Sequence, residues 1–104
     1  FFFAPISDAI TVMPHNITVE KQISEDRQKE LKVKSWPTWG CGVSEFPWSY
    51  SDQETFYLIK GEVTVTPDDG APATILAGDL ATMPAGMSCR WKVTKALEKH
   101  YNFE

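Results

Sequence analysis

The sequence predicts an all-β domain, and three observations carry this prediction. Seven prolines and six glycines divide 104 residues into short segments, as turns do in β-proteins. Several segments alternate apolar and polar side chains, the period of a strand with one buried face. Residues 24–31 form the one helical candidate, because Ser24 can cap a first turn that contains Glu25 and Asp26. Charged side chains lie on almost every face of this helix, so we expect the helix to be exposed to solvent.

The length of the chain suits a single domain with one small core. We expect residues 1–16 to form an N-terminal arm and residues 17–104 to form the domain. Short strands are predicted at residues 10–12, at an edge, and at residues 17–20. His15 follows a proline in the turn between them, so we expect it to be a solvated loop histidine.

Alternating side chains predict the longer strands of the second half of the chain. Glu54, Phe56 and Leu58 share one face of a strand whose other face also carries apolar groups, so we expect both faces to be covered. Gly61 separates this strand from a half-buried strand at residues 62–66.

The remaining strands are short or follow the same alternation. Turns rich in proline and glycine separate predicted strands at residues 74–76 and 80–83. Residues 89–94 give the cleanest two-residue period in the chain. The closing segment has one apolar face, formed by Leu97, Tyr101 and Phe103.

Composition argues against several classes of partner. The formal charge is −4 and lysines and arginines are scattered among acids, whereas nucleic-acid binding needs clustered positive charge. No apolar run approaches the roughly 20 residues of a membrane span. Cys41 and Cys89 are too few for a disulfide framework and lie in predicted strands, so we expect buried thiols and an intracellular, reducing compartment.

Residues 42–61 have the spacing of the first signature of the cupin family, which they resemble. Gly42 and Gly61 occupy its two glycine positions, and Glu54 occupies its glutamate position. The signature has a His-x-His pair where this chain has Trp48 and Tyr50. The residues that shape the backbone are therefore present, whereas most of the metal-ligand set is replaced.

A second cupin signature is matched by Gly78, Pro84 and Gly86, with Cys89 at the position of its histidine. Gly78 can adopt a positive φ and Pro84 fixes the turn, so the matched residues again shape the backbone. The two signatures together cover residues 42–93.

Further motifs resemble the small cupin group related to the (S)-ureidoglycine aminohydrolase cupin domain. This resemblance implies a cupin jelly-roll β-barrel of two antiparallel sheets, and a homodimer. Residues 39–48 resemble plant members, which implies a cytoplasmic or plastid protein. The motifs include Trp36-Pro37-x-Trp39, Gly61-Glu62-Val63, Gly78-Asp79-Leu80, Cys89-x-Trp91 and Lys99-His100-Tyr101.

The resemblance also bears on metal binding. The aminohydrolase has two cupin domains and holds manganese through a Glu/His/His/Gln set. This chain has Trp48, Tyr50 and Glu54 at equivalent places, with Cys89 or a neighbour as the fourth. Manganese prefers oxygen and imidazole donors, and an indole N–H offers no lone pair. We therefore predict no metal cofactor, with a divalent transition metal such as manganese as the alternative.

Two residues are candidates for catalysis. Glu54 is predicted to face the barrel interior, where it is either a general acid or base or a buried carboxyl held by a hydrogen bond. Cys89 would be a nucleophile if His100 served as its base, although strand alternation points His100 outward. An inert buried thiol is the favoured interpretation of Cys89.

An aromatic set is the candidate ligand-binding surface, with His100 added to it. Its rings could stack on a planar or sugar-like ligand or cage a cation, although filling the core is the favoured role. The set consists of Trp48, Tyr50, Tyr57 and Trp91.

Two functions follow from these observations, and a purely structural dimeric module is a third, less favoured alternative. The first is a cupin without metal that binds a small organic molecule in its barrel. The second is an enzyme related to (S)-ureidoglycine aminohydrolase, with Glu54 as its acid or base. The sequence does not identify the ligand or substrate.

Overall fold

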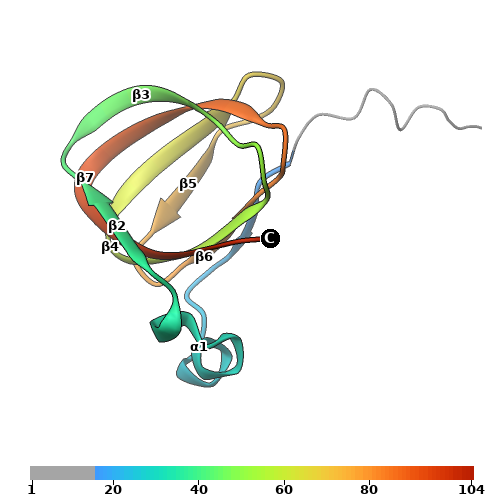
Figure 1. The fold of residues 1–104 in the computed structure, drawn as a ribbon. Helices are drawn as coiled ribbons and strands as arrows, with labels where there is room; N and C mark the ends of the chain where they lie inside the picture. The colour runs from blue at the N-terminus through green and yellow to red at the C-terminus, as the bar shows by residue number, and fades with distance from the viewer. Residues whose placement is uncertain (1–15) are drawn as a thin grey trace, which may run out of the picture.

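In the computed structural model of the protein, residues 16–104 are described, and most of them lie in antiparallel β-strands. Figure 1 shows these strands curving round a common interior, with the short helix outside the barrel. The elements are β1 (Thr18–Glu20), α1 (Glu25–Leu31), η2 (Val33–Ser35), β2 (Thr38–Cys41), β3 (Ser44–Ser49), β4 (Glu54–Pro67), β5 (Ala73–Leu76), β6 (Leu80–Met83) and β7 (Ser88–Phe103).

The long strands β4 and β7 link the two halves of the barrel. They pair with each other in antiparallel fashion along most of their length. On one half, β4 also pairs with β6, which pairs with β1, while the end of β7 pairs with β2. On the other half, β4 pairs with β5 and the start of β7 pairs with β3. This arrangement confirms the predicted all-β jelly-roll with antiparallel strands.

A bend at Gly61 lets β4 pass from one half of the barrel to the other. The register with β7 shifts between Leu58 and Val63, and Gly61 has a φ of 94°. A Cβ at this position would lie 2.4 Å from the carbonyl oxygen of Ala96 and 2.6 Å from the Cα of Leu97. Glycine is therefore required both by the backbone conformation and by the close neighbouring strand.

The strand boundaries around Gly61 differ from the predicted ones. Two separate strands on either side of Gly61 were expected, and the structure has one continuous strand with a bulge. The segments predicted at residues 89–94 and 97–103 likewise form a single strand, β7. A bulge within one strand and a turn between two strands give the same sequence signal, because both interrupt the alternation of side chains.

The core lies between the two halves of the barrel and follows the predicted alternation. Along residues 88–94 of β7, exposed and buried side chains alternate without interruption. On β4, the face of Glu54, Phe56 and Leu58 is buried. The core cluster consists of Tyr50, Phe56, Leu58, Val63, Val65, Ile75, Ala81, Met83, Met87, Cys89, Trp91, Val93 and Leu97.

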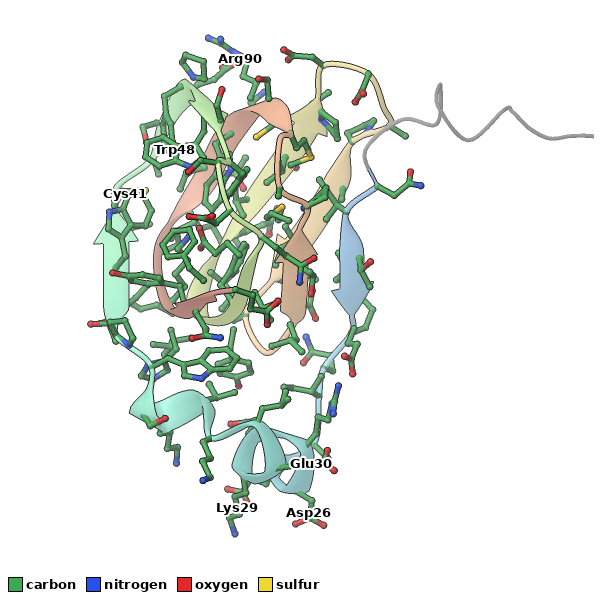
Figure 2. All side chains as sticks on the ribbon, turned by 45° about the vertical axis from the view of Figure 1, so that its right-hand side comes forward. Asp26, Lys29, Glu30, Cys41, Trp48 and Arg90 are labelled. Atoms are coloured by element: carbon green, nitrogen blue, oxygen red, sulfur yellow. The ribbon has the colours of Figure 1, made fainter. Side chains whose placement is uncertain are left out.

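Helix α1 confirms the predicted solvated helix. The Ser24 hydroxyl accepts a hydrogen bond from the Arg27 N–H at 3.1 Å, as an N-cap does, and no residue of the helix is buried. Figure 2 shows Asp26, Lys29 and Glu30 pointing away from the barrel. The helix therefore connects β1 to β2 without contributing to the core.

Other predictions have mixed outcomes. The strand predicted at residues 17–20 is present as β1, whereas the strand at residues 10–12 and the loop histidine lie outside the described residues. Cys41 and Cys89 are in strands as predicted and are both free; Cys89 is buried and Cys41 is half-buried. Within residues 16–104, no helix is long and apolar enough to cross a membrane.

Asp79 joins the start of the domain to the turn between β5 and β6. Its carboxylate is fully buried, accepts the backbone N–H groups of Gln22 (3.0 Å) and Leu76 (2.8 Å), and pairs with the Lys21 ammonium at 2.6 Å. Burial opposes ionisation, but the Lys21 hydrogen bond and the two backbone N–H groups outweigh it and lower the pKa of Asp79. The preceding Gly78, with a φ of 97°, allows the turn that presents these donors.

Replacing Asp79 with asparagine is expected to lower the free energy of unfolding by about 3 kcal/mol at pH 7, because buried donors lose a charged acceptor. A carboxyl whose pKa is lower in the folded than in the unfolded protein stabilises above the unfolded value of about 4, and this contribution disappears as the pH falls through the folded value. The difference between wild type and Asp79→Asn should therefore shrink in urea denaturation at acidic pH. Asp52→Asn, at an exposed carboxylate, is the control; an equal loss there would contradict the account.

Candidate functional site

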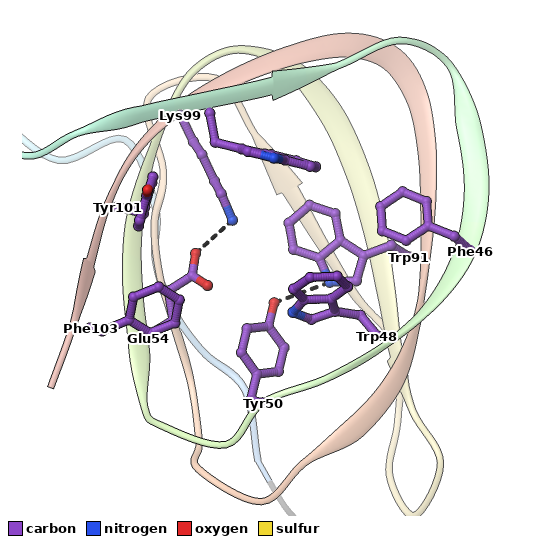
Figure 3. A pocket seen from close by; sticks show the side chains of 9 residues that line it. Phe46, Trp48, Tyr50, Glu54, Trp91, Lys99, Tyr101 and Phe103 are labelled. Atoms are coloured by element: carbon purple, nitrogen blue, oxygen red, sulfur yellow. Dashed lines mark hydrogen bonds and ion pairs between the residues drawn. The ribbon is translucent and has the colours of Figure 1, made fainter.

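A pocket of about 220 Å³ opens into the barrel between β2, β3, the start of β4 and both parts of β7. Figure 3 shows its side chains converging from these strands onto one cavity. Seven of the nine lining residues are aromatic, and the other two form an ion pair. The lining residues are Trp39, Phe46, Trp48, Tyr50, Glu54, Trp91, Lys99, Tyr101 and Phe103.

Trp91 is the central ring of the pocket wall. It stacks on Phe46 with ring centroids 6.0 Å apart, contacts Phe56 at 5.7 Å, and meets Trp39 edge to face at 6.2 Å. These rings come from three other strands, β3, β4 and β2. Trp91 thus ties the pocket wall to the core of the barrel, and its burial explains why this part of the wall is preformed.

Glu54 and Lys99 form a buried ion pair inside the pocket. The Lys99 Nζ lies 2.6 Å from the Glu54 Oε2, and the side chains are 7% and 4% exposed. Glu54 begins β4 and Lys99 lies near the end of β7, so the pair spans neighbouring strands. Figure 3 shows the two side chains pointing toward each other. Such a pair is costly to bury, so its place in an apolar cavity points to a role beyond packing.

Four rings surround the Lys99 ammonium, and we call them the aromatic cage. Its Nζ lies 4.5 Å from the Phe56 ring centroid, 4.8 Å from Trp91, 5.1 Å from Trp39 and 5.9 Å from Tyr101. Ring faces at these distances stabilise a cation. A cage for a ligand cation was considered among Trp48, Tyr50, Tyr57 and Trp91. Only Trp91 of that set belongs to the aromatic cage in the structure, which surrounds the protein's own lysine.

Lys99 was absent from the predicted site, although the sequence contained a signal for it. Residues 97, 99, 101 and 103 share one face of the last strand, and three of them are apolar. A lysine in that row is a charge directed at the core. The alternation of β7 could therefore have identified Lys99 before the structure did.

Tyr50 is the other buried polar group of the pocket. Its hydroxyl accepts a hydrogen bond from the Trp91 Nε1–H at 3.2 Å, and the residue is 3% exposed. Burial, followed by the negative charge of Glu54, raises the pKa of Tyr50. The phenol therefore stays protonated and keeps a hydrogen to donate.

The polar groups of the pocket retain unused hydrogen-bonding capacity. In the described part of the chain, Glu54 Oε1 accepts no hydrogen bond and the Tyr50 hydroxyl donates none. Lys99 directs one N–H at Glu54, and its remaining contacts are with the aromatic cage. Buried polar atoms without partners are uncommon, so these atoms mark a place where a bound molecule or water completes the hydrogen bonds.

The structure brings together four of the seven predicted site residues: Trp48, Tyr50, Glu54 and Trp91 all line the pocket. Glu54 was expected to be held by Tyr50 or by a backbone N–H if its role were structural, and its partner is Lys99 instead. Trp48 stands at the solvent side of the pocket, with half of its surface exposed.

Cys89, Tyr57 and His100 do not line the pocket. The Cys89 thiol donates to the Trp48 carbonyl oxygen at 3.5 Å, and burial raises its pKa to about 11, which disfavours a thiolate nucleophile. His100 is not one strand away from Cys89 but eleven positions along the same strand and on the opposite face. It therefore cannot serve as the base for Cys89.

Tyr57 and His100 lie opposite each other on β4 and β7, on the face of the strands that turns away from the pocket. The His100 Nδ1 is 3.0 Å from the Trp36 carbonyl oxygen, which holds the segment before β2 against β7. The structure therefore does not place the side chains of Tyr57 and His100 in the predicted ligand-binding site.

The donor chemistry at the expected metal positions does not suit manganese. Glu54 is already engaged by an ammonium, which would repel a divalent cation placed beside it. The raised pKa values of Tyr50 and Cys89 disfavour the phenolate and thiolate that a metal requires. Across residues 16–104, no three side chains of His, Cys, Asp or Glu cluster as a metal site would need.

Comparisons with known proteins agree on the family. The sequence model of the EutQ-like cupin domain matches residues 28–101. A solved DUF861 family protein from Thermotoga maritima is 44% identical, with a TM-score of 0.82 over 86% of this chain and all of that chain. No match was found among curated proteins.

Other solved structures share the fold at lower identity. A DUF861 family protein of unknown function from Pseudomonas syringae is 25% identical over 64% of this chain and 29% of its own length, with a TM-score of 0.58. The EutQ protein of Clostridium difficile is 15% identical, with a TM-score of 0.59 over 86% of this chain and 68% of that chain. From the domain match and the Thermotoga similarity together, the chain belongs to the EutQ-like cupin domain family.

Proposed function

We propose that the protein binds a small organic molecule in the barrel, with Glu54 and Lys99 as its polar anchor. The observation that carries the proposal is a buried ion pair with unused hydrogen-bonding capacity at the inner end of an aromatic pocket. Ligand sites combine apolar walls with a few convergent polar groups in this way. In this proposal, the anchor combines the signature glutamate with Lys99, while Trp48, Tyr50 and Cys89 occupy the positions where the cupin signatures have histidines.

The size and charge of the pocket limit the ligand. An apolar cavity of about 150 Å³ takes benzene, so a pocket of about 220 Å³ admits a singly substituted aromatic ring or a molecule of similar size. The ion pair is neutral as a whole, which favours an uncharged ligand. The spare N–H of Lys99 and the Tyr50 hydroxyl are donors, and Glu54 Oε1 is an acceptor, so a carbonyl or amide head group fits them.

A screen with three probes of similar shape tests this proposal. Benzamide, benzoate and benzylammonium differ in charge, and we expect benzamide to quench tryptophan fluorescence saturably and benzylammonium to bind most weakly, because the aromatic cage already holds a cation. Trp36→Phe, outside the pocket, should leave the quenching unchanged. No saturable change with any probe would overturn the proposal.

The second candidate function is C–N hydrolysis related to that of (S)-ureidoglycine aminohydrolase. The observation that favours it is the buried Glu54 carboxylate facing the pocket, within reach of a bound ureido group. Release of ammonia from (S)-ureidoglycine tests it, with and without added manganese. A rate equal to that in buffer alone in both cases would exclude it. The homodimer stays a prediction, which light scattering tests.

A further inference from the structure

We propose that Lys99 is a reactive amine, which captures an aldehyde or ketone in the pocket as a protonated imine, with Glu54 accepting the ammonium proton and returning it to the departing oxygen. This inference rests on the proposed ligand-binding function and names its substrate class, a small carbonyl compound. It concerns a residue that neither cupin signature includes.

The position of Lys99 suits attack on a bound molecule. Its Nζ faces the cavity, so a carbonyl group in the pocket lies beside the amine (Figure 3). Glu54 Oε2 holds the nitrogen from one side at 2.6 Å, and the walls of the pocket are aromatic. A nucleophile and its proton acceptor are thus already in contact, as covalent catalysis requires.

Imine formation needs an uncharged amine, and burial favours that form of Lys99. Burial lowers the pKa of Lys99, although the charge and hydrogen bond of Glu54 act in the opposite direction. Every other lysine of the chain lies in the described residues and is exposed. Lys99 should therefore be uncharged more often at neutral pH than any surface lysine.

The chemistry of the step balances with the groups present. Lys99 passes a proton to the Glu54 carboxylate, and the neutral amine attacks the carbonyl carbon to form a carbinolamine. Glu54 returns the proton to the departing oxygen, which leaves as water, and a carbon–nitrogen double bond forms. The nitrogen keeps one hydrogen and a positive charge, so no oxidant or reductant is needed.

The surroundings that hold the ammonium also hold the product. A protonated imine places its positive charge at the same nitrogen, between the Glu54 carboxylate and the aromatic cage. The cage therefore stabilises the charged imine much as it stabilises the lysine. The apolar walls also accommodate the hydrocarbon part of the carbonyl compound and limit the access of water that would hydrolyse it.

Reductive trapping tests the inference. The full chain is incubated with benzaldehyde and sodium cyanoborohydride at pH 7, and the benzylated lysines are located by peptide mass spectrometry. We expect Lys99 to react faster than the exposed Lys95, because burial lowers the pKa of Lys99 and so increases its share of free amine at pH 7. Equal rates at the two lysines, or no adduct at Lys99, would overturn the inference.

Three variants and the screen of binding probes distinguish the possible reasons for a negative result. Lys99→Arg should abolish the fast adduct while keeping a cation beside Glu54, and Lys95→Arg should leave it unchanged. Glu54→Gln lowers the pKa of Lys99 further, yet it should slow benzylation because the carboxyl that protonates the departing oxygen is lost; unchanged or faster kinetics would remove Glu54 from the step. If benzamide binds saturably but Lys99 gives no adduct, the imine proposal is wrong and the proposed ligand-binding function is unaffected. If none of benzamide, benzoate and benzylammonium binds, the proposed binding function itself is wrong.

Discussion

Replacing Lys99 with methionine is expected to lower the free energy of unfolding by about 3–5 kcal/mol, because it leaves the Glu54 carboxylate buried without a cation. The two side chains are only 7% and 4% exposed, so water compensates only in small part for the lost partner. Urea denaturation monitored by tryptophan fluorescence measures the effect.

Two further variants make this expectation specific. Lys95→Met removes an ammonium that is 73% exposed and 3.8 Å from Glu62, and should change stability by less than about 1 kcal/mol. The double variant Glu54→Met with Lys99→Met should recover most of the loss, since matched apolar side chains replace buried pairs at little cost. A Lys99→Met protein as stable as wild type would show that the pair is not buried as described.

The second large effect is expected at Trp91. Truncating Trp91 to alanine should lower the free energy of unfolding by about 3–5 kcal/mol. The indole is 2% exposed, contacts Phe46, Phe56 and Trp39, and donates to the Tyr50 hydroxyl. Its removal leaves a cavity and an unpartnered hydroxyl in the same place.

Trp48→Ala is the matched control, because it removes the same side chain at the solvent side of the pocket. Trp48 is 50% exposed, so we expect a stability loss below about 1 kcal/mol. Because its ring lines the pocket, benzamide should bind about 2–10-fold more weakly. If Trp48→Ala destabilised the protein as much as Trp91→Ala, or left probe binding unchanged, it would be wrong to place Trp91 in the buried wall of the pocket and Trp48 at its solvent side.

Local patterns predicted much of the fold because the physics involved is local. The N-cap at Ser24 and the alternation in β7 depend on neighbours in the sequence, and both were predicted. The continuity of β4 through Gly61 was missed, since it depends on the close approach of Leu97, a residue far along the chain. Sequence spacing shows that glycine is present there but not which strand lies against it.

The candidate site was predicted in part for a similar reason. Trp48, Tyr50 and Glu54 were found by the spacing of a family signature, which marks the barrel interior. Cys89 belonged to the second signature, yet its thiol donates to the Trp48 carbonyl oxygen. The direction of this side chain depends on local packing. Lys99 belongs to neither signature. A search that considers only the signature positions and their ligand residues therefore does not find it.

The most direct test of the central claim, that Lys99 and Glu54 form a buried pair inside the aromatic pocket, is an NMR titration of lysine side-chain nitrogens in the ¹⁵N-labelled protein. We expect one lysine, assigned by its loss in Lys99→Arg, to titrate at lower pH than all the others, because burial lowers its pKa. Glu54→Gln should lower that pKa further, since the carboxylate raises it. A common titration of all lysines at the ordinary value, unaltered in Glu54→Gln, would contradict the account.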